Sequence, residues 1–431
     1  MPSVTTFSPT EHRALAQTGR RTLVGDLLRR YWLPALLSEE IAGPDSDPVR
    51  VRLLGEDLVA FRDSAGRAGL LAEHCPHRGA SLFLGRNEDG GIRCSYHGWK
   101  FDIAGRGLEC PNAPELAGTE DARQLAYPCQ EAGGIVWAYL GPPEARPPLP
   151  DLGYLAAGDD SRYAMKRWQD CHWLQALEVD IDSSHVAWLH REELLASPGD
   201  PKTRIILDQT APAFEVAERD YGLLIGASRP DGDDADYWRV NQWLMPWYTF
   251  IPAESDDEVL GVHAWVPVDD DHCWVWGLSW HPRRALTSAE LDDWRAGRGG
   301  RFPELLPGGY YPRRNAGNQW EIDRSAQRSG RLWMGIEGNQ EQDDAITASM
   351  GTAYDRSRER LVGTDLGVIA TRRRLLACAR DVAAGGEPPG AEGTSYDVVP
   401  VSVHLPRGAD WAAEIDAVIS TRVGTGPQVP A

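Results

Sequence analysis

Two short segments each place a cysteine and a histidine at the spacing of metal ligands. Cys75 precedes His77 by two residues, and Cys94 precedes His97 by three. Two thiolates and two imidazoles can bind one zinc ion tetrahedrally, or they can hold a Rieske [2Fe–2S] cluster, in which two His replace two Cys on one iron. The order Cys…His, Cys…His fits a zinc finger poorly, but the two loops alone leave both options open.

A second group of possible metal ligands follows about a hundred residues downstream. His185 is followed by His190 after five positions, and Asp182 precedes His185 by three. Two imidazoles and a carboxylate are the usual ligands of an open non-haem iron(II) site, which suits oxygen activation. A zinc finger needs no second site of this kind, whereas an electron-storing cluster needs a separate iron at which oxygen reacts. Both motifs together therefore favour the cluster.

The chain resembles the catalytic α-subunit of Rieske non-haem iron aromatic-ring oxygenases. Within that family it is most similar to the phthalate dioxygenase-like group, which includes aromatic-acid dioxygenases and O-demethylases. The likeness runs from residues 25–32 to the stretch around 372–374, and both metal motifs keep the family's order and spacing. Ser95 is a departure, because the family often has proline there. Ser95 is not a ligand, so we expect it to tune the rigidity of the loop.

The resemblance implies a role for each motif. The [2Fe–2S] cluster would be bound by Cys75, His77, Cys94 and His97, and the mononuclear iron(II) by His185, His190 and Asp343. Asp344 is the rival of Asp343, since one slip along a helix would exchange them. Asp182 would accept a hydrogen bond from a ligand histidine and join the iron to the cluster of a neighbouring subunit. Electrons from NAD(P)H would arrive through a separate flavin or iron–sulfur reductase, with O₂ as co-substrate.

The sequence predicts an α+β protein in three parts. We expect an N-terminal helical segment over 1–45, an all-β Rieske domain over 46–145, and a catalytic domain over 152–431. Five prolines within 141–152 are typical of a linker. Alternating or apolar runs predict a meander of antiparallel strands in the last part, and the resemblance implies a helix-grip fold there. The strands are expected near 49–54, 57–62, 70–73, 135–140, 163–169, 214–218, 223–228, 237–246, 258–266 and 273–280.

Two helices are predicted with specific features. Ser8, Pro9 and Glu11 match the N-cap, N1 and N3 positions of a capping box. The stretch from about 172 to 190 reads as a helix that carries the iron motif. On a regular helix, residues five apart lie about 140° apart, so we expect this helix to break between His185 and His190.

Composition narrows the possible partners and the compartment. The net charge is −20, with 64 acidic and 44 basic residues, so the surface repels phosphate and argues against nucleic acid. No apolar run approaches the roughly 20 residues of a membrane span. The N-terminal residues do not resemble a secretory signal. Seven cysteines, an odd number, are typical of reduced thiols in the cytoplasm.

The expected function is that of the terminal oxygenase component of a multi-component system, which hydroxylates an aromatic, carboxylated substrate. The alternative is a monooxygenase or O-demethylase acting on a methoxylated aromatic or a natural-product intermediate. A non-catalytic, metal-stabilised ligand-binding protein and a pure electron carrier are alternatives of other classes. Substrate contacts are expected from Arg204, Arg239 and Met245. The family implies head-to-tail homotrimers or dimers of trimers.

Overall fold

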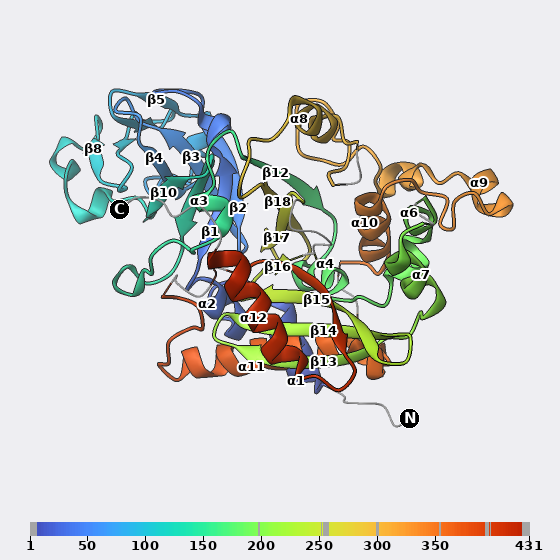
Figure 1. The fold of residues 1–431 in the computed structure, drawn as a ribbon. Helices are drawn as coiled ribbons and strands as arrows, with labels where there is room; N and C mark the ends of the chain where they lie inside the picture. The colour runs from blue at the N-terminus through green and yellow to red at the C-terminus, as the bar shows by residue number, and fades with distance from the viewer. Residues whose placement is uncertain are drawn as a thin grey trace. The chain divides into compact units, whose positions relative to one another are not determined.

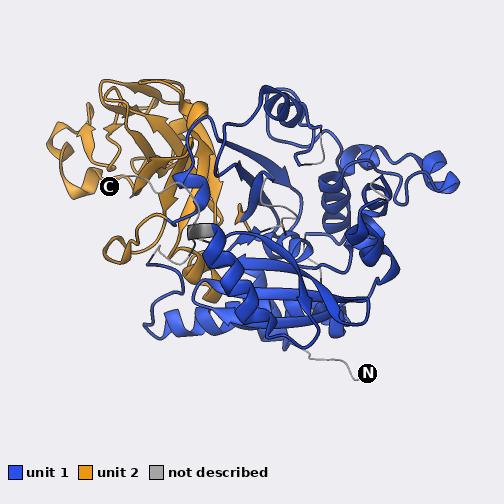
Figure 2. Ribbon diagram, in the orientation of Figure 1, with its two compact units in different colours: residues 1–17, 150–265, 270–431 blue, residues 18–149, 266–269 orange. Residues whose placement is uncertain are grey.

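The computed structural model describes residues 7–196, 199–250, 252, 258–298, 301–352, 355–392, 396 and 398–424. The chain forms two compact units (Figure 2). The smaller unit consists of residues 18–149 and 266–269, and the larger unit of residues 1–17, 150–265 and 270–431. Residues 7–17 thus belong to the larger unit.

The smaller unit is built from three antiparallel sheets, as the all-β expectation required (Figure 1). Its core is apolar, with Phe61, Leu71, Ile92 and Phe101 fully buried together. A short helix, α2 (Leu23–Leu28), precedes the first strand. In sheet order the strands are β1 (Trp32–Leu37), β11 (Ile135–Tyr139) and β10 (Cys129–Ala132); β2 (Val49–Leu53), β3 (Glu56–Arg62), β4 (Ala68–Ala72) and β9 (Ala126–Tyr127); and β5 (Arg86–Glu88), β6 (Gly91–Arg93), β7 (Lys100–Phe101) and β8 (Gly107–Glu109).

The larger unit contains one antiparallel sheet of eight strands, which confirms the predicted meander. Seven strands run in the order β12-β18-β17-β16-β15-β14-β13. The eighth strand, β19, pairs with residues 235–240 in the first part of β15. The bounds are β12 (Arg162–Gln169), β13 (Ala213–Arg219), β14 (Gly222–Asp231), β15 (Ala235–Leu244), β16 (Tyr248–Phe250), β17 (Leu260–Pro267), β18 (Cys273–Trp280) and β19 (Val401–Pro406).

Helices surround this sheet (Figure 1). α11 (Leu366–Ala383) packs against β13 and β14, while α4 (Trp173–Asp180) contacts β16 and α10 (Asn339–Ser349). No helix in the described part of the chain is long and apolar enough to cross a membrane. The other helices are α1 (Pro9–Ala16), α3 (Gly153–Ala156), α5 (Val186–Leu189), α6 (Arg191–Ala196), α7 (Pro201–Asp208), α8 (Ser288–Arg295), α9 (Arg324–Ser329) and α12 (Trp411–Gly424).

A buried ion-pair network fastens α4 to α11. Glu178 on α4 accepts hydrogen bonds from Arg372 at 2.6 Å and 2.7 Å and from Arg356 at 2.9 Å, and Glu359 also pairs with Arg372. Burial opposes ionisation of Glu178, but the two guanidinium groups outweigh it and lower its pKa to about 2. The network therefore stabilises the fold while Glu178 stays ionised.

We predict that Glu178→Gln lowers the free energy of unfolding at pH 7 by about 3 kcal/mol. This is the free energy that corresponds to lowering the pKa of Glu178 from its ordinary value to about 2. A lowered carboxyl pKa stabilises the fold above about pH 4.5 and loses this effect as the pH falls toward 2. Urea unfolding at pH 7 and pH 3 should show the difference between the two proteins shrinking at the lower pH. Asp208→Asn, which removes an exposed pair with Arg204, is the control and should cost little. An equal difference at both pH values would contradict the prediction.

Candidate metal centres and the adjoining cavity

The two cysteine–histidine loops lie over the core of the smaller unit. Cys75 and Cys94 are buried in that core. The rings of His77 and His97 are half-buried at its edge, with centroids 4.5 Å apart. The ring of Trp99 stacks on His77 at 4.9 Å. The loops thus keep the thiols inside and present the imidazoles near the surface.

The chemistry of these four side chains suits an iron–sulfur cluster. Burial raises the pKa of Cys75 to about 11, and the nearby Cys94 thiol adds to this rise, while backbone N–H groups of His77 and Arg78 oppose it. Such thiols ionise readily only when a cation binds them. Each loop closes on itself, since Gly79 N–H donates to the Cys75 carbonyl at 2.8 Å and Gly98 N–H to that of Cys94 at 3.0 Å.

The segment that carries the second histidine pair breaks before His185. α4 ends at Asp180, and α5 then spans Val186–Leu189, between the two histidines. The helix also ends at His190, because α6 begins only at Arg191, so the predicted break lies at the two ends of the interval from His185 to His190 and not inside it. A local turn causes the break before His185. In this turn Asp182 Oδ1 accepts hydrogen bonds from the backbone N–H and the hydroxyl of Ser184 at 2.7 Å and 2.6 Å.

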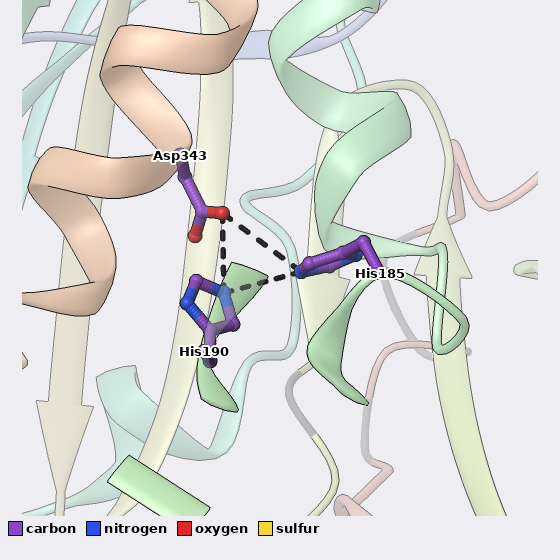
Figure 3. Close-up of side chains that lie close together, drawn as sticks. All are labelled: His185, His190 and Asp343. Carbon is purple, nitrogen blue, oxygen red and sulfur yellow. Dashed lines mark hydrogen bonds and ion pairs between the residues drawn. The ribbon is translucent and has the colours of Figure 1, made fainter. Parts of the chain in front are cut away.

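This turn and α10 bring three donor atoms together (Figure 3). Nε2 of His185 lies 3.2 Å from Nε2 of His190, and Asp343 Oδ1 lies 3.2 Å from His190 Nε2 and 3.8 Å from His185 Nε2. Ligands about 2.1 Å from one metal ion at right angles would stand about 3.0 Å apart. Asp343 Oδ1 is also buried with no hydrogen-bond partner in the described chain. The donor set therefore fits a metal ion bound by two His and one carboxylate.

The outer nitrogen of each histidine has its own neighbour. His190 Nδ1 lies 2.8 Å from Gln342 Oε1, and Gln342 in turn donates to the Ile336 carbonyl at 2.8 Å. His185 Nδ1 lies 3.6 Å from Asp182 Oδ2. A donor role for Nδ1 leaves the Nε2 lone pair for a metal. Sequence reasoning missed Gln342, although its place directly before Asp343 was a usable signal.

The side chain of Asp344 is directed away from the histidines and toward Arg167. Its Oδ1 lies 2.7 Å from Nη2 of Arg167 on β12, on a different side of α10 from the histidines. Burial raises the pKa of Asp344 to about 7, and Arg167 opposes this rise. Among the two rival carboxylates, only Asp343 faces the histidine pair.

A cavity of about 340 Å³ adjoins the three donor atoms. Arg239, on β15, and Lys202, on α7, line it, as does Asp182. Arg204 is 83% exposed and pairs with Asp208 at 3.4 Å. Met245 is fully buried. Neither Arg204 nor Met245 is among the described residues that line the cavity, so of the three residues expected to contact substrate only Arg239 reaches it.

Asp180 forms part of the cavity wall and holds the end of α4 on the sheet. Its Oδ2 accepts hydrogen bonds from Thr249 at 2.5 Å and His263 at 3.0 Å, and its carbonyl accepts from Asn241 at 2.7 Å. Burial opposes ionisation, but the hydrogen bonds and the nearby His263 lower the pKa of Asp180. Asp180 therefore has partners on three strands. These contacts fix the end of α4, which directly precedes the turn that carries His185.

Known proteins are similar in sequence to nearly the whole chain. Residues 31–120 match the Rieske [2Fe-2S] domain, and residues 138–420 match the family described as LigXa C-terminal domain like. The oxygenase subunit of 3-chlorobenzoate-3,4-dioxygenase from Comamonas testosteroni is 36% identical, covering 93% of this chain and 96% of that protein. The oxygenase subunit of phthalate 4,5-dioxygenase from Pseudomonas putida is also 36% identical, with 91% and 90% covered.

The chain belongs to the Rieske non-haem iron oxygenase family. It falls in the phthalate dioxygenase-like group, and it binds a Rieske [2Fe–2S] cluster and a mononuclear iron. A crystal structure of dicamba monooxygenase bound to dicamba shares the fold, with a TM-score of 0.56 and 18% identity, covering 83% of this chain and 99% of that one.

Both relatives are named as the oxygenase subunit of a dioxygenase, and this chain is likewise a Rieske non-haem iron oxygenase. The similarity to these dioxygenase subunits spans 96% and 90% of their lengths. The two alternatives, a non-catalytic ligand-binding protein and a pure electron carrier, therefore find no support. The α+β expectation, a Rieske β domain followed by a catalytic domain with an antiparallel sheet, is confirmed.

We predict that Gln342→Leu weakens iron(II) binding at the mononuclear site about 10- to 100-fold, because His190 loses the acceptor that orients its ring. Titration of iron(II) into protein treated with a chelator, with the cluster retained, measures the dissociation constant. The visible absorption of the cluster is the internal control and should not change. Wild-type iron affinity in the variant would show that Gln342 does not orient His190.

Proposed function

We propose that this oxygenase inserts oxygen into a small aromatic carboxylate held in the cavity beside His185, His190 and Asp343. One observation carries the substrate class. Arg239 lines the same cavity as the three donors, its Nε is buried without a hydrogen-bond partner, and it pairs with no carboxylate in the described chain. A half-buried guanidinium that pairs with no carboxylate in the described chain suits a carboxylate ligand, which it can bind in bidentate fashion.

A second cation supports the same substrate class. Lys202 also lines the cavity, near the start of α7. Arg229, on the strand paired with β15, is fully buried, and desolvation together with Arg239 lowers its pKa to about 10. The guanidinium groups of Arg229 and Arg239 are thus close enough for their charges to repel each other. The relatives named for chlorobenzoate and phthalate act on aromatic carboxylates as their names state, which is consistent with this proposal.

We also propose which residues hold the metal groups. Cys75, His77, Cys94 and His97 would hold the cluster, and His185, His190 and Asp343 the mononuclear iron. When bound, the cluster supplies single electrons and the iron supplies open coordination positions at which O₂ is activated.

The protein's own side chains would then have separate tasks. Arg239 and Lys202 orient the carboxylate of the substrate, so that one ring edge faces the three donors. Gln342 holds the ring of His190 through its Nδ1 atom, and the charge of Asp182 lies 3.6 Å from Nδ1 of His185. The walls of the cavity limit the water that reaches the reacting ring. Arg239 and the donors thus define the two ends of the bound substrate.

Dioxygenation and O-demethylation would use the same residues and differ in which carbon faces the donors. Incubation with a reductase, NADH and a panel of aromatic acids, with and without methoxy groups, separates them by product. A cis-dihydrodiol indicates dioxygenation and a phenol with formaldehyde indicates O-demethylation. Failure of every carboxylate, with turnover of neutral aromatics, would contradict the proposed substrate class.

Assembly and location complete the proposal. We propose a homotrimer or a dimer of trimers, in which Asp182 of one subunit approaches the cluster of the next. The reductase is a flavin or iron–sulfur protein. All seven cysteines are free thiols in the structure, which supports a reducing compartment such as the cytoplasm.

Arg239→Met should raise the KM for an aromatic carboxylate about 10- to 100-fold, because a charge-assisted hydrogen bond contributes about 1.5–3 kcal/mol. Arg204→Met is the matched control, since Arg204 lies outside the cavity, and its KM should stay at the wild-type value. Steady-state kinetics with the reductase gives both numbers. Equal effects of the two substitutions would contradict the assignment of Arg239.

Asp182→Asn should retain the cluster and the iron but separate cluster oxidation from product formation. The substitution removes the charge that links His185 to the neighbouring subunit while preserving the shape of the turn at Ser184. A single-turnover experiment with the pre-reduced oxygenase compares the cluster oxidised with the product formed. A normal product yield in this variant would exclude the bridging role of Asp182.

A further inference from the structure

The first half of α10 buries an unusual run of polar residues. The five consecutive residues 340–344 are each less than a tenth exposed, and three of the five are acidic. Acidic side chains are seldom buried without a partner, because desolvation of an unpaired charge is costly. The partners of this run therefore determine how α10 is seated in the larger unit.

The partners divide the run into two faces. Gln342 and Asp343 are directed at His190, with 2.8 Å from Gln342 Oε1 to Nδ1 and 3.2 Å from Asp343 Oδ1 to Nε2. Gln340 and Asp344 are directed at Arg167 instead. Nη2 of Arg167 lies 2.9 Å from Gln340 Oε1 and 2.7 Å from Asp344 Oδ1.

Arg167 reaches α10 from the edge strand β12 and is itself 2% exposed. Its Nη1 lies 3.2 Å from Oε1 of Gln169, two residues along the strand. Gln169 donates to the Thr347 hydroxyl at 2.6 Å. Gln340, Asp344 and Thr347 follow the i, i+4, i+7 spacing of one helical face. β12 therefore holds a single face of α10 over two turns.

Rotation of α10 decides which carboxylate meets the histidines. Successive helical residues point about 100° apart, so Asp343 and Asp344 cannot both face them. The bond pattern between β12 and α10 turns Asp344 toward Arg167 and thereby turns Asp343 toward the histidines.

We propose that Arg167 is a positioning residue for the iron site, which fixes the rotation of α10 by binding Gln340 and Asp344 and so presents Asp343 to His185 and His190. This inference rests on the proposed role of Asp343 as an iron ligand. Without Arg167, Asp344 becomes a buried carboxylate with no cationic partner. Rotation of α10 then lets Asp344 compete with Asp343 for the iron.

The matched control is the neighbouring residue on the same strand. Lys166 is a buried cation too, but strand alternation places it on the opposite face of β12, where it lies 4.7 Å from the ring of Trp274 and 4.6 Å from that of Tyr310. Lys166→Met therefore removes a buried charge from β12 while leaving the bonds between Arg167 and α10 in place.

The test measures iron(II) affinity in the full-length protein with its cluster intact. Arg167→Met should weaken iron(II) binding about 10- to 100-fold, as loss of support for a metal ligand generally does. Lys166→Met should leave it within about twofold of wild type. Arg167→Lys keeps one charge but cannot bind both Gln340 and Asp344, so its affinity should lie between those of wild type and Arg167→Met. The EPR spectrum of the nitric oxide adduct of the iron should change in Arg167→Met and not in Lys166→Met.

A double variant supplies a readout that mere destabilisation would not give. Adding Asp344→Asn to Arg167→Met removes the competing carboxylate, and iron(II) should then bind more tightly than in Arg167→Met alone. Equal weakening by Arg167→Met and Lys166→Met, or wild-type affinity in Arg167→Met, would overturn the proposal. Asp343→Asn separates the role of Asp343 as an iron ligand from the role of Arg167 in positioning it. If Asp343→Asn loses iron while Arg167→Met does not, only the positioning role fails; if Asp343→Asn keeps iron, the proposed ligand set itself fails.

Discussion

Convergence of His185, His190 and Asp343 on one point is the constraint on which the larger unit depends. The histidines come from a turn and a short helix, and the carboxylate comes from α10, more than 150 residues later in the chain. Three donor atoms within 4.8 Å of one another repel or compete for protons unless a cation lies between them. The surrounding structure must therefore hold them in place at a cost in local stability.

Buried polar networks provide that support on each side. Glu178 ties α4 to α11 through Arg372, and Asp180 ties the end of α4 to three strands. Gln342 orients His190 from α10 itself. Each network is anchored to the large antiparallel sheet or to a helix packed on it, so the site is built on rigid elements and its geometry follows from the fold. The cavity beside it is lined by the three donor residues and also by Arg239 and Lys202.

Local patterns in the sequence predicted local structure well. Ser8 and Glu11 form the expected capping box, and the strands lie within a few residues of their predicted positions. The loops around Cys75 and Cys94 close on themselves and bring the rings of His77 and His97 together, because contacts within a loop depend on few residues. The family resemblance added Asp343, which no local pattern connects to the histidines.

Features that depend on tertiary contacts could not be predicted in the same way. The helix breaks before His185, where the side chain of Asp182 bonds the backbone of Ser184, and again at His190, where α5 ends. Arg204 and Arg239 looked equivalent in sequence, but Arg204 pairs with Asp208 on the exposed face of α7. The roles of Gln342 and Asp344 depend on the rotation of α10, which sequence periodicity does not specify where both faces of a helix are buried.

The most direct test of the account is the iron and acid-labile sulfide content of the purified, iron(II)-reconstituted protein, with the EPR spectrum of its dithionite-reduced form. The account predicts about three irons and two sulfides per chain, together with a Rieske-type signal. About two irons and two sulfides after reconstitution would show that the cluster forms but that the His185, His190 and Asp343 site does not hold iron. Zinc without sulfide would contradict both metal assignments.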